Sequence, residues 1–267
     1  MTAVPPSARA RRPRRDDPSL AAVAATELAR LRRGFPAWFT VGLPFALVLP
    51  LGVIAVASPE GQAGQVWSTW FRVVVMFWGV LLPMAAALYA SMAVRQDESA
   101  RAVLYGYAVP RHRYLVGRFA ALTVLGLAQA VLLLALLAPI GVALEGPHTV
   151  GPTALAVLVP WASASASVAL CVLVAEVWGF APAVCVGVAG MMFGALLADK
   201  SVWWAVPMGW PMTVVVPLAG IRANGVPLPP GDPLADTGVI PLAVALSLAS
   251  TAVLLAIGAR HVNRKEL

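Results

Sequence analysis

The residues that catalysis most often needs are few in this chain and are not grouped. Its two lysines, Lys200 and Lys265, do not follow a glycine, so the sequence has no Gly-Lys-Ser/Thr loop that could hold a nucleotide phosphate. The histidines, His112, His148 and His261, lie outside the long apolar stretches, so a serine within such a stretch has no histidine base beside it. We therefore predict that the chain is not an enzyme and binds no cofactor of its own.

Residue types also argue against a metal site or an ion-coupled pathway. Cys171 and Cys185 fall within apolar stretches, where two isolated thiols are too few for a zinc site and are out of reach of an oxidising aqueous face. Ion-coupled transporters mark their pathway with buried ionisable residues, and the deep parts of these stretches have none. Arg72 and Glu176 lie at the ends of stretches, where a side chain can snorkel to water. We expect no metal site, no structural disulfide and no mechanism driven by protons or sodium.

The composition indicates that most of the chain is embedded in a lipid bilayer. It has 267 residues, of which 60% are hydrophobic and only 12% are charged, whereas about 25% of a soluble domain is charged. A spanning helix needs about 20 apolar residues, and we predict an all-α polytopic membrane protein with six transmembrane helices. The fourth and fifth spans are nearly continuous, so a single long segment is an alternative there. The predicted spans are residues 37–57, 70–92, 116–143, 153–175, 178–198 and 238–259.

The positions of the basic residues predict the orientation. The formal net charge is +7, and of the 19 Arg and Lys eight precede the first span, five lie in or beside the segment 95–118, and three follow the last span. Because basic residues are retained on the cytoplasmic side, we expect both termini and this segment inside, with the chain in a bacterial cytoplasmic membrane. Topology and contact with anionic membrane lipids explain the basicity, so we expect no nucleic-acid partner.

The chain divides into three parts by composition. Residues 1–16 are rich in arginine and proline and are predicted to form a disordered basic tail. Residues 17–36 are predicted to form an amphipathic interfacial helix, with Asp17 as N-cap and Pro18 at the first helical position. Residues 37–267 form the six-span domain. The apolar face of the amphipathic helix is expected to carry Leu20, Ala24, Leu28 and Leu31.

Small residues and prolines mark two further features. Ser163 and Ser167 in the fourth span, and Gly190 and Gly194 in the fifth, are predicted to allow close helix packing in lipid. The stretch 201–217 is apolar but interrupted by proline, so we expect an outer interfacial or re-entrant element that caps the bundle. Its tryptophans suit the headgroup level, and they are Trp203, Trp204 and Trp210.

The segment between the second and third spans is the most informative. Asp97 and Glu98 begin a short predicted helix, where acidic residues suit the positive end of the helix dipole. Pro110 forces the helix to end. Leu104 and Tyr105 give this segment apolar groups rimmed by charge, which is typical of a docking surface. An ordinary cytoplasmic loop is equally compatible with the composition.

This segment resembles the cytoplasmic signature of type-2 ATP-binding-cassette exporter permeases, nearest to the lantibiotic-immunity and drug-efflux subgroups. That signature has an acid after span two, a short apolar helix, Pro-x-Arg, an aromatic or apolar pair, and a basic residue entering span three. Arg101-Ala102 depart from it, because Gly-Thr often follows the acid. The matching residues here are Asp97 or Glu98, Leu104, Pro110, Arg111, Arg113, Tyr114, Leu115, Gly117 and Arg118.

The resemblance implies a partner that supplies the energy. The helix 97–109 would be a coupling helix docked on a separate ATPase subunit, which would act as a dimer and bind ATP and Mg, and the helix 18–33 would be a connecting helix beside it. The implied ATPase-coupling residues are Glu27, Asp97, Glu98, Arg101, Leu104, Tyr105, Pro110 and Arg111.

The resemblance also implies a pathway and a cargo. Two permease subunits, identical or homologous, would form the path for an exported amphiphile: a peptide antibiotic, a drug or a lipid. A membrane scaffold or sensor that binds a partner through the same segment is the main alternative, and a channel is the third. The implied outer-gate residues are Trp203, Trp204, Pro207, Trp210 and Pro211.

Overall fold

The computed structural model describes residues 18–59, 61–97 and 110–264, and these residues form long helices joined by short turns. The helices are α1 (Leu20–Leu31), α2 (Phe35–Ala57), α3 (Ala63–Asp97), α5 (Arg111–Leu144), α6 (Val150–Ser163), α7 (Ser165–Trp178), α8 (Phe180–Leu197), α9 (Trp210–Ala219) and α10 (Val239–Arg264). Short 3-10 turns are η1 (Pro147–Thr149), η2 (Trp203–Ala205), η3 (Pro207–Gly209) and η4 (Pro233–Ala235).

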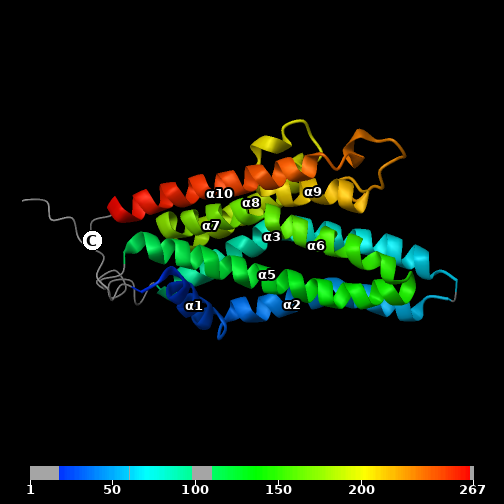
Figure 1. Ribbon diagram of the computed structural model, residues 1–267, viewed down its shortest axis with the longest axis horizontal. Helices are drawn as coiled ribbons and strands as arrows, with labels where there is room; N and C mark the ends of the chain where they lie inside the picture. Colours follow the sequence, from blue (N-terminus) through cyan, green and yellow to red (C-terminus); the bar gives the residue numbers. More distant parts are fainter. Residues whose placement is uncertain (1–17, 60, 98–109, 265–267) are drawn as a thin grey trace, which may run out of the picture.

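Among the residues that the structure describes, six segments are long and apolar enough to cross a membrane: α2, α3, α5, the α6–α7 pair, α8 and α10. The prediction of an all-α protein with six spans is confirmed. The spanning helices run side by side along the long axis, with α1, the start of α5 and the end of α10 gathered at one end (Figure 1). We call this the basal end and the opposite end the distal end. Helix α3 is the most buried span, whereas α2 and α10 expose most of their surface.

Glycine and proline set the helix boundaries. Pro110 precedes the first residue of α5, as expected for a residue that favours a helix start over a helix interior. Gly179 has a φ of 87° and separates α7 from α8, a conformation that glycine adopts without steric cost. The fourth and fifth spans are therefore separate helices rather than one long segment.

The fourth span is interrupted at Ala164, between α6 and α7, and a side chain of α10 hydrogen-bonds to the backbone at this interruption. Ser247 donates to the Ser163 carbonyl (2.7 Å) and accepts from the Ala166 amide (3.1 Å). Backbone groups freed by a break inside a bilayer need such partners, because lipid offers none. One serine on α10 thus fixes the geometry where α6 meets α7.

The stretch 201–217 lies deeper than an interfacial cap. After η2 and η3 it forms α9, which packs against α3, α6 and α10. Trp210 is only 2% exposed, whereas Trp204 is 60% exposed, so Trp210 packs inside the protein and Trp204 lies on its surface. Helix α8 and η3 approach closely because Gly194 and Gly209 have no side chains there. A Cβ on Gly209 would lie 3.1 Å from the Gly194 carbonyl oxygen.

The amphipathic helix also differs from its prediction. Ser19, not Asp17, is the N-cap of α1, and its hydroxyl accepts from the Ala22 amide at 3.2 Å. The buried face consists of Val23, Glu27 and Leu31, so an acid sits at the centre of the stripe that faces the bundle, while Leu20 is exposed. The predicted face is correct for Leu31 and for half-buried Leu28. It is wrong for Leu20, and Glu27 takes a place in the buried stripe because it has a charged partner on another helix.

Candidate functional site

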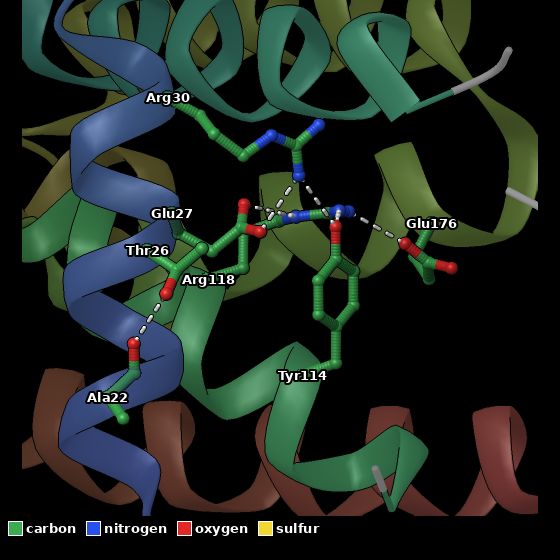
Figure 2. Close-up of polar contacts among 7 residues, drawn as sticks. All are labelled: Ala22, Thr26, Glu27, Arg30, Tyr114, Arg118 and Glu176. Atoms are coloured by element: carbon green, nitrogen blue, oxygen red, sulfur yellow. Dashed lines mark hydrogen bonds and ion pairs between the residues drawn. The ribbon is translucent and has the colours of Figure 1, made fainter. Parts of the chain in front are cut away.

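Charged side chains from three helices meet at the basal end of the bundle. Tyr114 and Arg118 are one turn apart on α5 and therefore share a face. Glu27 and Arg30 extend from α1, and Glu176 comes from α7, two residues before that helix ends. Figure 2 shows all five side chains converging around the Arg118 guanidinium. We call these five residues the basal ionic cluster.

Arg118 makes the contacts that join the three helices. Its Nη1 donates to Glu176 Oε2 at 2.9 Å, and its Nη2 donates to the Tyr114 hydroxyl at 2.8 Å. Its Nε lies 3.8 Å from Glu27 Oε2. A guanidinium suits this position because its planar fork can face several acceptors at once.

Arg30 and the Tyr114 ring complete the cluster. Arg30 Nη1 lies 3.0 Å from Glu27 Oε1 and 3.4 Å from the Tyr114 hydroxyl. The Arg118 guanidinium also lies over the Tyr114 ring, 4.7 Å from its centroid, a favourable cation–π geometry. Two guanidinium groups thus face two carboxylates, and the formal charges of the cluster cancel.

Three members of the cluster are removed from water, whereas Arg30 and Tyr114 are half-buried. Arg118 is 1% exposed, and Glu27 and Glu176 are each 4% exposed. A buried charge is tolerated only when it is paired and hydrogen-bonded, so each member depends on the others. Removing one partner would leave an uncompensated buried charge.

Glycine allows α1 to come close enough for these contacts. A Cβ at Gly117 of α5 would lie 2.6 Å from Val23 Cγ1, so the two helices touch where a side chain would separate them. Arg113 adds a hydrogen bond between α5 and the residue before the N-cap of α1, because its Nη1 donates to the Pro18 carbonyl at 3.4 Å. The position of α1 against α5 is therefore fixed by packing as well as by charge.

Two sequence-based interpretations at this end of the bundle are wrong. Glu176 was expected to snorkel to water at a span end, and Arg118 was placed at the edge of a loop. Instead α1 covers this end, and the two side chains point inward and pair. Both residues lie near the basal ends of their helices, so the pair is buried by protein at a span end and not in the deep part of a span.

The predicted ATPase-coupling residues are only partly described. Glu98, Arg101, Leu104 and Tyr105 lie outside the described residues, and Asp97 is the last residue of α3. Pro110 is the N-cap of α5 and Arg111 is its first residue, and both are half-buried. Glu27 points into the bundle toward Arg118 rather than outward, so in this structure its carboxylate is not available to a docked protein.

The residues predicted for packing lie at helix contacts. Ser163 and Ser167 are buried, and the Ser163 hydroxyl donates to the Pro160 carbonyl at 2.9 Å. Gly190 and Gly194 face η3: a Cβ at Gly190 would lie 2.8 Å from the Met208 side chain, and one at Gly194 would lie 2.7 Å from the Met208 carbonyl oxygen.

The predicted gate residues do not form one layer. Trp203 and Pro207 are half-buried and Trp204 is exposed, while Trp210 and Pro211 are buried at the start of α9. Residues 203–211 therefore run from the surface of the bundle to its interior.

Within the described residues, no three His, Cys, Asp or Glu side chains are grouped so as to hold a metal ion. The basal ionic cluster holds two carboxylates, two guanidinium groups and a phenol, each engaged with another member of the cluster. Such an arrangement joins α1, α5 and α7 mechanically.

Sequence reasoning missed the roles of Arg118, Glu176 and Ser247. The spacing of Tyr114 and Arg118 and the position of Glu27 between Val23 and Leu31 are the signals that could have indicated the cluster. Comparison of the chain with protein-family models, with curated proteins and with solved structures finds no match. The resemblance of segment 95–118 to exporter permeases therefore stays a prediction.

Proposed function

We propose that this chain is the membrane-spanning permease subunit of an ATP-driven exporter in a bacterial cytoplasmic membrane. A separate ATP-binding-cassette ATPase, acting as a dimer, would bind ATP and Mg. A second permease subunit, identical or homologous, would complete the path. The cargo would be an amphiphile, such as a peptide antibiotic, a drug or a lipid.

The observation that carries the proposal is the link that Arg118 makes at the start of α5. The proposed coupling segment, residues 97–109, is followed directly in the sequence by Pro110 and α5. A displacement of that segment would move the first turns of α5, which carry Tyr114 and Arg118. Through the contacts of Arg118 at 2.9 Å to Glu176 and 3.8 Å to Glu27, α7 and α1 would move with α5.

This linkage offers a route from the basal end to the middle of the bundle. Helix α7 begins at the break beside Ala164, where a helix pair can change its angle more easily than an unbroken helix. Ser247 ties that break to α10. Work delivered at the basal end would therefore reach the α6–α7 break and α10 through packed helices.

Co-reconstitution in liposomes tests the proposal. When Mg-ATP is supplied, the chain and its ATPase partner should move a fluorescent amphiphile out of the leaflet that faces the ATPase. Liposomes with the ATPase alone should show no such movement. A scaffold or sensor subunit would support ATPase binding without cargo movement. ATP-independent ion conductance through the chain alone would favour a channel.

Buried Glu176 favours a second candidate, transport driven by a proton gradient, because intramembrane carboxylates often carry protons. Its 2.9 Å contact with Arg118 favours a structural role instead. A proton gradient without ATP should then give no cargo movement. Gradient-driven movement that Glu176→Gln abolishes would support the proton-coupled candidate.

A further inference from the structure

A cavity of about 330 Å³ lies within the bundle, between α3, α5, the α6–α7 break and α10. Its walls are mostly hydrocarbon, from side chains such as Leu82, Leu122, Val168 and Leu248. The volume is about twice that of an engineered 150 Å³ protein cavity that binds benzene. We call it the lateral cavity.

The polar side chains that line the lateral cavity use their hydrogen bonds within the protein. A ligand held here would therefore find few groups to bond with, and its buried part should be apolar. The bonds are Tyr89 to Gln129 (3.0 Å), Thr123 to the Phe119 carbonyl (2.9 Å), Ser165 with Ser247 (2.9 Å) and Thr251 to the Ser247 carbonyl (2.8 Å).

Trp161 is the exception among these lining groups. Its indole N–H has no hydrogen-bond partner among the described residues, although the ring lines the cavity. Gly126 leaves the edge of that ring uncovered, since a Cβ there would lie 3.4 Å from Trp161 Nε1. The cavity thus combines a mostly apolar lining with the indole N–H of Trp161.

The lateral cavity reaches the outer surface of the bundle. Leu248 of α10 is 56% exposed, and Thr123 and Gly126 of α5 are half-buried. Nearer the basal end the two helices touch, because a Cβ at Gly258 would lie 2.7 Å from the Leu115 side chain. In a bilayer the exposed side of α5 and α10 faces acyl chains.

We propose that the lateral cavity binds one hydrocarbon chain of an amphiphile, which enters from the bilayer between α5 and α10. The Trp161 N–H would donate to an ester, amide or hydroxyl oxygen near the head of that chain. A volume of this size suits a single chain, so a two-chain lipid would insert only one. The site does not depend on the transport proposal, because binding requires neither ATP nor the ATPase.

Photolabelling of the full chain in nanodiscs tests the site. One arm uses a single-chain lysophospholipid with a diazirine in its acyl chain, and the other uses the matching two-chain phospholipid, so that a free amphiphile and bulk lipid are distinguished. Label should concentrate on residues 119–129 and 161–168, and an excess of unlabelled lysophospholipid should suppress it saturably. Saturable label in both arms would identify bulk lipid as a source of the chain.

Two substitutions test the chemistry. Gly126→Leu should fill the cavity without moving the backbone, because its Cβ meets Trp161 atoms only at 3.4 and 3.6 Å. Labelling should fall about tenfold, as expected for the loss of roughly two buried methylenes. Gly42→Leu is the matched control, since a Cβ there has no atom within 4 Å. Trp161→Phe replaces the indole with a smaller aromatic ring that has no donor, and labelling should fall about fivefold.

The competition experiment on the unmodified chain guards against misfolded variants. Label spread evenly over the lipid-facing helices, or label that an excess of unlabelled lysophospholipid does not reduce, would overturn the proposal. Unchanged labelling in a folded Gly126→Leu variant would overturn it as well. None of these outcomes would bear on whether the chain works with an ATPase.

Discussion

Arg118 is the residue on which the basal end of the bundle depends. It is 1% exposed and faces the carboxylates of Glu27 and Glu176. Arg118→Met should leave both carboxylates buried without their shared partner, at a cost of about 3–5 kcal/mol in the free energy of unfolding. Denaturant unfolding in nanodiscs measures this cost. Arg260→Met, the same change at an exposed position near the end of α10, should cost almost nothing; similar losses in both variants would contradict a structural role for the cluster.

Asp232 should give the loop between α9 and α10 a dependence on pH. The Leu234 amide and the Arg222 guanidinium hydrogen-bond to its carboxylate and hold its pKa below the ordinary value. A lowered pKa means that this stabilisation is present above the ordinary aspartate pKa and is lost as the pH falls through the lowered value. Protection of the amides in residues 222–236 against hydrogen exchange, expressed relative to the intrinsic exchange rate at each pH, should therefore decrease on acidification, and Asp232→Asn should remove this dependence. A pH-independent pattern in the unmodified chain would contradict it.

At the scale of elements, the attachment of α1 to α5 can be tested directly. Gly117→Leu should push α1 away, because even a Cβ at this position would collide with Val23. Proteolysis or hydrogen exchange within residues 20–31 should then increase by about an order of magnitude or more, since the helix would lose its packed face. Gly151→Leu is the control, because a Cβ there has no atom within 4 Å. Equal protection of α1 in both variants would show that Gly117 is not needed for the contact.

The sequence was sufficient for the spanning helices but not for their details. Each span is a long apolar run, and such a run in a bilayer has one stable form, a helix. The break at Ala164 was missed because its stabilising partner, Ser247, lies more than 80 residues away. The place of Glu27 on the inward face of α1 was missed because the residue pattern of a helix shows only its own charges. It does not show that the partner of Glu27 lies on α5.

The same limit applies to the candidate site. Buried α9 shows why Trp210 could not be placed from composition: a tryptophan suits both a headgroup and a packed core. Glu176 was expected to reach water from its span end because the sequence does not show that α1 folds over that end. Long-range contacts decide these positions, and a single sequence contains no direct record of them.

At the scale of the whole molecule, orientation is the first prediction. Both termini should face the cytoplasm, because the basic residues cluster at the basal end. In a Cys171→Ala, Cys185→Ala background, a membrane-impermeant thiol reagent added outside intact cells should label Asn224→Cys and not Arg264→Cys. The reverse pattern would place the proposed coupling segment outside and contradict the proposed function.

Residues 97–109 are proposed to receive work from a separate ATPase. The most direct measurement is affinity purification of the tagged full chain from its native membranes, with ATP hydrolysis assayed in the eluate. We expect a P-loop ATPase to copurify with the unmodified chain and to be lost with Leu104→Asp and Glu98→Lys. The control is Val226→Asp, an apolar-to-acid change in the loop between α9 and α10, which should retain the ATPase. All four chains should insert into the membrane equally. Full retention of the ATPase by both segment variants, or no ATPase with the unmodified chain, would contradict it.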